Sequence, residues 1–230
     1  MTPTGPWSVS VVVPALEEAH EIEAALRSVG PAGTHEIVVV DGGSADDTVA
    51  RTEALGVRVV QATRGRANQM NVGAESTTGN ALIFLHADTW LPADWHDQVC
   101  AALDEGAVAG RFDVDLRGAS AMLRVVAAAM NRRSRWSRLY TGDQAIFVRR
   151  AVFEAVGGFE AIPVMEDLAL SKRLKDEGPI ASLRAKVSTS GRRWETRGVL
   201  RTITLMWWLR FAYFVGVSPD RLARLYRAVR

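Results

Sequence analysis

A single cysteine, Cys100, occurs among the 230 residues, so the chain cannot form an internal disulfide. A protein without disulfides suits a reducing compartment. The opening residues, MTPTGPW, carry neither a basic segment nor a long apolar core, and we expect no secretory signal. Internal repeats and low-complexity linkers are also missing from the sequence. These absences favour one domain with a cytoplasmic active site.

Two common nucleotide-binding signatures are absent as well. A dinucleotide-binding dehydrogenase opens its first helix with G-x-G-x-x-G, whereas this chain has PALEE at residues 14–18. The P-loop pattern does not occur either. Hydride transfer and NTP hydrolysis by these routes are therefore disfavoured.

The charge is distributed unevenly, although its net value is only +2. Residues 184–230 contain 11 basic and 2 acidic residues, a net of +9, and residues 1–183 carry a net of −7. A basic tail indicates an anionic neighbour such as phosphates, a membrane surface or nucleic acid. The alternative is a solvated face that packs on the acidic body.

The first half alternates apolar runs with helical patterns. The predicted strands are Val9–Val13, Glu36–Val40, Arg58–Gln61 and Leu82–Leu85, and the predicted helices are Glu18–Ser28, Asp46–Leu55, Arg66–Ser76 and Ala93–Leu103. This alternation predicts an α/β fold with a mostly parallel central sheet and helices on both faces. Ser44 and Asp47 resemble a capping box for the second helix, and Gly56 is placed to end it.

The second half is less regular. It predicts strands over Ala109–Leu116 and Ala145–Val148, and helices over Ser120–Arg138, Ala151–Val156 and Asp167–Glu177. The aromatic tail Val199–Val217 contains Arg201 and Arg210, and these charges make it a poor membrane-spanning segment. An amphipathic helix there either lies at a membrane interface or packs on the domain and covers a sheet edge.

Acidic residues follow two of the predicted strands. LIFL runs into His86, Ala87 and Asp88, and EIVVV runs into Asp41. Ligands of open α/β sheets bind at the carboxyl ends of the strands. Asp88 and His86 are therefore candidate ligands of Mg²⁺ or Mn²⁺, which proteins often hold through one or two carboxylates plus substrate phosphates. Asp41 either accepts hydrogen bonds from a nucleoside or caps the turn that follows it.

A second acidic pair, Glu166 and Asp167, opens a predicted helix. Such acids are favoured by the helix dipole alone. A preceding glycine- and proline-containing loop also allows Asp167 to reach the site as a general base. Four arginines are candidates for binding diphosphate: Arg64, Arg66, Arg192 and Arg193.

Six segments in sequence resemble the family-2 glycosyltransferases, which are inverting enzymes with the GT-A fold. They are VSVVVPALEE, EIVVVDGGSADDT, GRANQMNVGA, GNALIFLHADT, GDQAIFVRRAVFEAVGGFE and MEDLALSKRL, and they cover about Val9 to Leu174. The GRANQMN and FLHAD segments further resemble a small bacterial subgroup of this family.

The resemblance implies roles for particular residues. Asp167 would be the catalytic base, with Glu166 beside it, and Asp88 and His86 would form the metal site. The donor-binding residues would be Pro14, Ala15, Glu17, Asp41, Arg66, Gln69, Asn71, Ala87, Asp143, Gln144 and Arg193. The chain departs from the family pattern where His86-Ala87-Asp88 replaces D-x-D, Glu17 replaces asparagine and Gly42 replaces a second aspartate.

We expect one domain over residues 1–230, because the sequence contains no internal repeat or low-complexity linker. Its parts would be a nucleotide-sugar half (1–110), an acceptor and catalytic half (111–198) and an amphipathic tail (199–230). The Q-x-x-R-W motif of processive synthases appears only as SGRRW at residues 190–194, so we expect transfer of a single sugar.

The expected donor is a nucleotide-diphosphate sugar, with a UDP-sugar favoured. The expected acceptor is a small or lipid-like molecule with a hydroxyl or carboxyl group, for example a carotenoid acid such as 4,4'-diaponeurosporenoate. Peripheral contact with the inner face of the cell membrane would run through the tail. Two alternatives stay open, a nucleotidyltransferase and a non-catalytic nucleotide-sugar-binding protein. The acidic main body argues against binding of nucleic acid.

Overall fold

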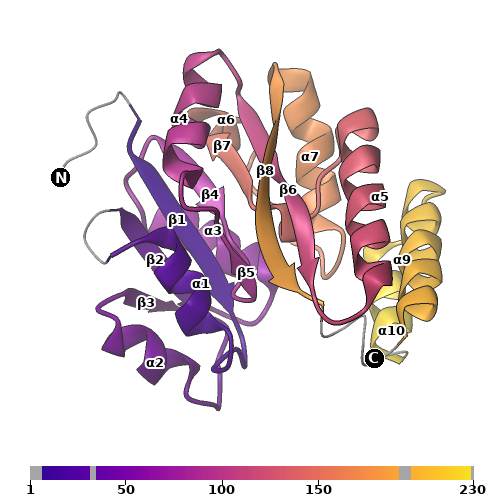
Figure 1. Cartoon of the computed structure of the whole chain (residues 1–230), viewed down its shortest axis with the longest axis horizontal. Helices are drawn as coiled ribbons and strands as arrows, with labels where there is room; N and C mark the ends of the chain where they lie inside the picture. The colour runs from indigo at the N-terminus through magenta and orange to yellow at the C-terminus, as the bar shows by residue number, and fades with distance from the viewer. Residues whose placement is uncertain (1–6, 32–34, 192–197, 229–230) are drawn as a thin grey trace.

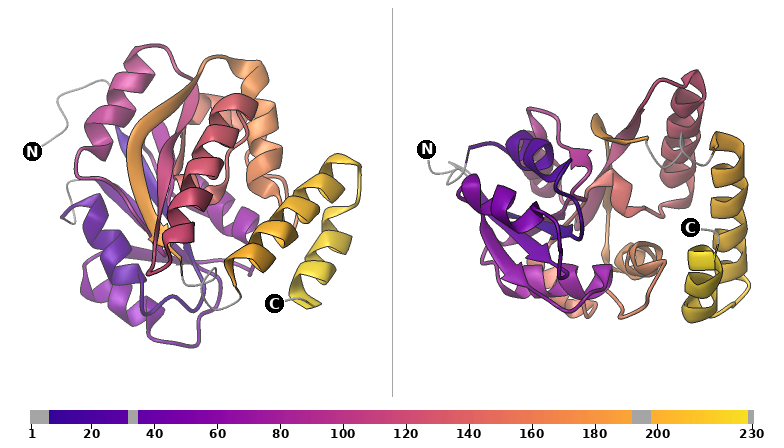
Figure 2. Two further views of the ribbon diagram at one scale, coloured as in Figure 1. Left: turned by 45° about the vertical axis from the view of Figure 1, so that its right-hand side comes forward. Right: turned by 90° about the horizontal axis from the view of Figure 1, so that it is seen from below.

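The computed structural model describes residues 7–31, 35–191 and 198–228. Within these residues an eight-stranded sheet forms the centre, with strand order β3-β2-β1-β4-β7-β6-β8-β5 (Figure 1). Helices cover both faces of the sheet, as Figure 2 shows. The predicted α/β class with a mostly parallel sheet is confirmed.

The first half has the predicted alternation. The parallel strands are β1 (Val9–Ala15), β2 (Glu36–Asp41), β3 (Arg58–Gln61) and β4 (Ala81–Phe84), and the helices between them are α1 (Ile22–Val29), α2 (Thr48–Ala54) and α3 (Arg66–Glu75). The strands are almost wholly buried because both of their faces are covered by helices. Their carboxyl ends therefore meet at one edge.

The second half reverses the strand direction at β7 (Ile146–Arg149), which pairs antiparallel with both β4 and β6 (Ala109–Arg117). Ile146 lies opposite Phe84, so the start of β7 lies beside the end of β4. A short 3-10 helix, η1 (Gly142–Gln144), immediately precedes β7. This pairing brings η1 next to the HAD segment.

The remaining elements of this half include two strands that the sequence did not indicate. They are β5 (Thr89–Trp90) and β8 (Ile180–Ser190), and the helices are α4 (Trp95–Asp104), α5 (Ala121–Ser137), α6 (Arg150–Ala155) and α7 (Glu166–Glu177). Strand β8 has few buried positions, and Ala181, Leu183, Ala185 and Val187 alternate along it with polar residues. It is held by a long parallel ladder with β6.

The core lies in two layers, one on each face of the sheet. Val11 and Val13 point into the layer under α1, α4 and α5, whereas Val12 points into the layer under α3, α6 and α7. This separation follows from the alternation of side chains along a strand.

One predicted helix cap is wrong. Helix α2 begins after Asp47 without a side-chain cap, and the Ser44 hydroxyl donates instead to Asp41. Gly56 does follow the end of α2 with φ at 70°, and its N–H donates to Glu53, as expected of a helix-ending glycine.

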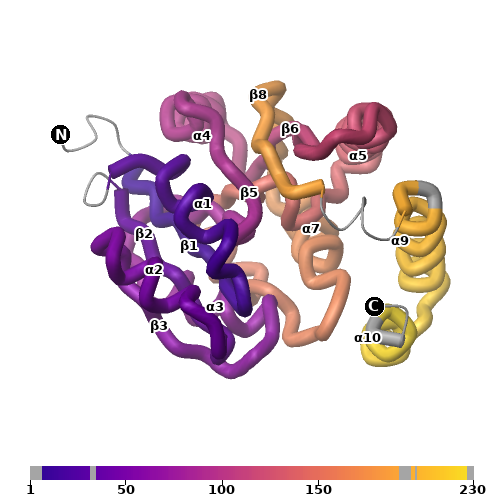
Figure 3. Tube along the Cα trace, turned by 60° about the horizontal axis from the view of Figure 1, so that its bottom comes forward, coloured from indigo at the N-terminus to yellow at the C-terminus, as the bar shows by residue number. Residues whose placement is uncertain are grey.

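Two helices end the chain, α9 (Val199–Phe214) and α10 (Pro219–Ala228). Leu209, Ala212 and Leu222 form a small cluster with Val164 and Met165, which precede α7. Figure 3 shows α9 beside α5, so the tail packs on the domain without covering an edge of the sheet. Among the described residues, none of the helices combines the length and apolar character needed to cross a bilayer.

Candidate active site

Asp41, at the end of β2, is buried and holds the turn after its strand. Its carboxylate accepts hydrogen bonds from the N–H groups of Gly43 and Ser44, both 3.0 Å from Oδ2, and from the Ser44 hydroxyl at 2.5 Å. The turn-capping alternative for Asp41 is therefore realised in this structure. A nucleoside contact by Asp41 stays a prediction.

The loop after β1 is fixed to the same turn. The Glu17 N–H donates to the Ser44 hydroxyl at 2.9 Å, and the Glu17 carboxylate accepts from the Ala45 N–H at 2.8 Å. Pro14 and Ala15 end β1 directly beside Asp41. The two loops thus form one rigid rim at the carboxyl end of β1 and β2.

The side-chain amides of Gln69 and Asn71, both on α3, were predicted to contact the nucleotide sugar. In this structure they hold the protein's own backbone. The buried Gln69 amide donates to the carbonyls of Ala15 and Val40, both at 2.8 Å, and so holds the ends of β1 and β2 together. The Asn71 amide exchanges two hydrogen bonds with the backbone of Phe159, at 2.8 and 2.9 Å. Contacts of Gln69 and Asn71 with a nucleotide sugar stay predictions.

Arg66, at the start of α3, faces the acidic side of the site. Its guanidinium lies 3.4 Å from the buried Glu166 carboxylate. Four carboxylates act on its charge, those of Glu166, Asp143, Asp167 and Asp88. Burial alone would lower the pKa of Arg66, but these carboxylates more than reverse that effect and the pKa is raised. Arg66 and the four acids therefore form one electrostatic cluster.

Glu166 contributes to this cluster from a buried position. Its burial raises the pKa of the carboxyl group, while the charge of Arg66 opposes that rise. With its side chain only 4% exposed, Glu166 anchors Arg66 and leaves little surface for a substrate.

His86 packs against η1. Its Nδ1 lies 3.3 Å from an Asp143 carboxylate oxygen, and its buried Nε2 has no hydrogen-bond partner. A Cβ added at Gly142 would lie only 2.2 Å from that Nε2, so glycine is the residue that fits there. Both ring nitrogens thus face η1, which favours positioning of Asp143 over metal ligation by His86.

Asp88 is half-buried and lightly engaged. Its carboxylate accepts a single long hydrogen bond, from the Thr89 hydroxyl at 3.3 Å. Ala87, between His86 and Asp88, is buried. Within the described residues there is no group of three histidine, cysteine or acidic side chains arranged to hold a metal ion. Asp88 is accordingly available as a lone protein carboxylate.

Asp167, in the first turn of α7, is held in one orientation. The Gly142 N–H donates to its Oδ2 at 2.9 Å, and the Leu168 N–H donates to its Oδ1 at 2.7 Å. Asp143 of η1 is 40% exposed, whereas Gln144 is fully buried. The Gln144 amide bonds to Ser134 and Thr141 and so holds η1; a contact of Gln144 with the donor sugar stays a prediction.

Backbone strain gathers around these residues. Glu17, Ala145 and Met165 have positive φ angles of 57°, 46° and 69° although none is glycine. Each adjoins a part of the site, at the end of β1, after η1 and before Glu166. Such strain persists only where surrounding contacts enforce it, and it is typical of functional sites.

Three side chains near the site were not singled out as site residues from the sequence: Arg133 of α5, and Arg210 and Tyr213 of α9. The charges of Asp167 and Asp143 act on both arginines, and that of Asp167 acts on Tyr213. The only signal in the sequence was the excess of arginine in these segments. The predicted donor residue Arg193 lies outside the described residues.

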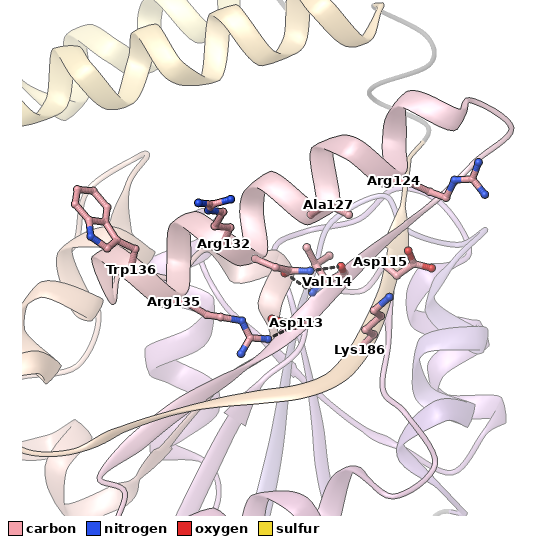
Figure 4. Close-up of a pocket in the computed structure, with 11 residues that line it drawn as sticks. Asp113, Val114, Asp115, Arg124, Ala127, Arg132, Arg135, Trp136 and Lys186 are labelled. Atoms are coloured by element: carbon pink, nitrogen blue, oxygen red, sulfur yellow. Dashed lines mark hydrogen bonds and ion pairs between the residues drawn. The ribbon is translucent and has the colours of Figure 1, made fainter.

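A hollow of about 700 Å³ lies elsewhere, between α5 and strands β6 and β8 (Figure 4). Its Asp113 is already paired with Arg111 and Arg135. Asn131 and Arg135 line it, and Arg133 points away because two residues turn an α-helix by about 200°. The oriented carboxylate Asp167 is not among its lining residues, so we place the reaction outside this hollow.

Comparison with protein families gives one match over much of the chain. The model of "Glycosyl transferase family 2" matches residues 10–163. A "PGL/p-HBAD biosynthesis glycosyltransferase" of Mycobacterium tuberculosis is 33% identical over 170 residues, which cover 65% of this chain and 62% of that protein. The alignment thus spans less than two thirds of that relative's length.

Two solved structures share this fold. S. aureus TarS 1–349 in complex with UDP-GlcNAc has a TM-score of 0.65 at 20% identity, covering 80% of this chain and 58% of that one. Glucosyl-3-phosphoglycerate synthase from Mycobacterium tuberculosis, in complex with Mg²⁺ and UDP, has a TM-score of 0.62 at 23% identity, covering 79% and 70%.

Proposed function

This chain belongs to glycosyltransferase family 2, and we propose that it transfers a single sugar from a UDP-sugar to an acceptor hydroxyl with inversion. The observation that carries this proposal is the oriented carboxylate of Asp167. It lies at the open edge of the sheet, in the same electrostatic cluster as Asp88, Asp143 and Arg66.

Asp167 would act as the general base. Its two backbone hydrogen bonds fix the carboxylate before the substrate arrives, which is the geometry that proton transfer requires. The acceptor oxygen would attack the sugar carbon opposite the leaving nucleoside diphosphate, and Asp167 would take the hydroxyl proton. One direct displacement of this kind inverts the sugar carbon.

The donor would occupy the edge formed by β1, β2 and β4. UDP and UDP-GlcNAc in the solved structures with this fold support a uridine nucleotide. Pro14, Ala15, Glu17 and Asp41 would border the nucleoside, and Arg66 would face the diphosphate. Asp143 would adjoin the sugar from η1. Gln69, Asn71 and Gln144 would act only by holding this frame.

A divalent ion fits the site in one arrangement. Asp88 offers one half-buried carboxylate, which suits Mg²⁺ or Mn²⁺ held mainly by substrate phosphates and water. When bound there, such an ion supplies Lewis acidity toward the leaving diphosphate. We assign Asp88 as its protein ligand, while His86 positions Asp143.

The acceptor would be lipid-like and reach the site at a membrane surface. Trp207 and Phe211 on the outer face of α9 are 69% and 66% exposed, and the tail around them is basic. Exposed aromatic side chains beside basic residues suit an anionic membrane interface. Peripheral attachment to the inner face of the cell membrane would follow from this contact.

The role of Asp167 bears on the acceptor group. A carboxyl acceptor, such as a carotenoid acid of the 4,4'-diaponeurosporenoate type, is already deprotonated at neutral pH and needs no base. A hydroxyl acceptor does need one. The oriented Asp167 therefore favours a hydroxyl as the attacking group.

A donor screen tests the proposal. The protein is incubated with UDP-, GDP- and TDP-sugars with Mg²⁺, Mn²⁺ or a chelator, and thermal stabilisation and release of nucleoside diphosphate are measured. We expect UDP-sugars to stabilise the protein and to be hydrolysed slowly in the presence of metal. Stabilisation without hydrolysis or transfer would support the alternative of a non-catalytic binder, and release of pyrophosphate would support a nucleotidyltransferase.

A further inference from the structure

Arg133 and Arg210 bring two positive charges together beside the site. Helix α5 carries Arg133 and helix α9 carries Arg210, and the two helices pack side by side (Figure 3). Burial and the charge of Arg210 lower the pKa of Arg133 to about 10, against the attraction of Asp167 and Asp143. The charge of Arg210 thus acts on Arg133 across the contact between the two helices.

Neither guanidinium is paired in the part of the chain that the structure describes. Nε and Nη2 of Arg133 are buried without a hydrogen-bond partner. Arg210 is half-buried, and no ion pair or hydrogen bond joins either arginine to another described residue. Burying like charges without a counter-charge is unfavourable. An anion bound between the two arginines would remove this cost.

The position of the pair separates it from the donor side. Asp88, which lies between β4 and β5, acts on Arg66. The acids that act on Arg133 and Arg210 are Asp167 and Asp143. Asp143 and Asp167 thus act on all three arginines, whereas Asp88 and Glu166 act on Arg66 and not on the pair. An anion at the pair would belong to the molecule that approaches Asp167 from the acceptor side.

Helix α9 also carries Tyr213, about one turn after Arg210. Burial raises the pKa of the Tyr213 hydroxyl, and the charges of Glu160 and Asp167 raise it further. Leu209 and Ala212, on the packed side of the helix, are buried. Trp207 and Phe211 lie on its outer face. One helix therefore presents polar groups to the site and aromatic groups to the solvent.

We propose that Arg133 and Arg210 bind a phosphate or carboxylate group of the acceptor, beside the hydroxyl that Asp167 deprotonates. This inference rests on the proposed glycosyl transfer. Guanidinium groups bind both kinds of anion through paired hydrogen bonds, which the unpartnered Nε and Nη2 of Arg133 can supply. The acceptor would then be an amphipathic acid that carries a separate hydroxyl group.

The family match does not supply this site. It ends at residue 163, so Arg210 and Tyr213 lie beyond it. The pair also joins two elements that are distant in the sequence.

The test uses Arg133→Gln, Arg210→Gln and the double variant, with Arg132→Gln as the matched control. Arg132 is an exposed arginine on the same helix. The probes are inorganic phosphate and acetate, titrated by calorimetry into protein saturated with UDP and Mg²⁺. Binding of UDP to each variant is measured separately, and a thermal melt checks the fold.

We expect each single variant to weaken binding of one or both probes by about tenfold, because one charge-assisted contact is lost. The double variant should abolish it, and UDP binding and Arg132→Gln should match the wild type. Unchanged binding of both probes in a folded double variant would overturn the inference. Weakened UDP binding would assign the pair to the donor diphosphate and also overturn it.

Failure of the proposed function is a separate result. If no nucleotide sugar is bound or hydrolysed by the wild type, glycosyl transfer is refuted whatever the probes do. If donors are hydrolysed while the arginine variants bind the probes normally, only the acceptor site is refuted.

Discussion

The backbone N–H of Gly142 donates a hydrogen bond to the Asp167 carboxylate over 2.9 Å. This bond joins η1, at the start of β7, to the first turn of α7. The same glycine lies against the His86 ring, which follows β4. One residue without a side chain therefore sets the relative positions of the proposed base, Asp143 and the HAD segment.

Replacing Asp167 by asparagine should remove the proton acceptor while keeping the shape of the side chain. We expect the transfer rate to fall by about 10²- to 10⁴-fold, the usual contribution of a general base, with donor binding unchanged. Donor binding and turnover are measured on the same preparation. Asp176→Asn, an exposed position on the same helix, is the control and should keep full activity. Equal turnover in both variants would remove Asp167 from the mechanism.

Adding a methyl group at Gly142 should displace His86. The new Cβ would lie 2.2 Å from Nε2 of the ring, a separation that the two atoms cannot keep. We expect Gly142→Ala to lower the unfolding free energy by about 1–3 kcal/mol, as overpacking does, and to reduce turnover. In a His86→Ala background, Gly142→Ala should lower the unfolding free energy much less, because the clashing ring is absent. Equal costs in the two backgrounds, by chemical denaturation, would contradict the contact.

Gln69 should matter for stability more than for donor binding. Gln69→Leu leaves two strand-end carbonyls without this donor, so we expect a loss of about 2 kcal/mol in unfolding free energy. The folded variant should bind UDP as the wild type does. Gln98→Leu, which removes only a surface contact with Asp94, is the control. Loss of UDP binding without loss of stability would restore the predicted donor contact.

Burial of Glu166 should make stability depend on pH. Its pKa is raised in the folded state, so folding takes up a proton between the unfolded and folded pKa values. The unfolding free energy should therefore decrease as the pH rises through that window, which starts at about pH 4.3. Glu166→Gln should remove this contribution. The unfolding free energies of the wild type and Glu166→Gln are compared across this pH range. A wild type that does not lose stability relative to the variant as the pH rises would contradict the assignment.

Membrane contact should depend on the outer face of α9. Trp207→Ser and Phe211→Ser should each weaken binding to vesicles with anionic phosphatidylglycerol by about tenfold or more, because each removes a large apolar group. Binding is measured by co-sedimentation, with phosphatidylcholine vesicles for comparison. Trp136→Ser is the matched control, since that tryptophan is 89% exposed on α5. Equal losses in all three variants, or none, would refute a specific role of α9.

The strands β1 to β4 were predictable because each is a short apolar run followed by a polar segment. Helix α7 was predictable because its acidic first turn follows a glycine- and proline-containing loop. Strand β8 was not predicted, although its apolar and polar side chains alternate over Ala181–Val187 as is typical of a half-buried strand. Its parallel pairing with β6 joins segments far apart in the chain, and no local pattern shows that pairing.

The sequence by itself determined the fold class and the chemistry available at the sheet edge. Strand β2, which ends on Asp41, and strand β4, which a short loop connects to Asp88, follow from local hydrophobic patterns that one stretch of chain contains completely. Only the tertiary structure decided how these groups are used. In that structure Asp41, Gln69 and Asn71 hold loops and strand ends through hydrogen bonds. The His86 ring lies against Asp143, and the charge of Arg210 acts on Arg133. These roles depend on distances between distant segments, which the sheet pairing and the packing of α9 on α5 fix.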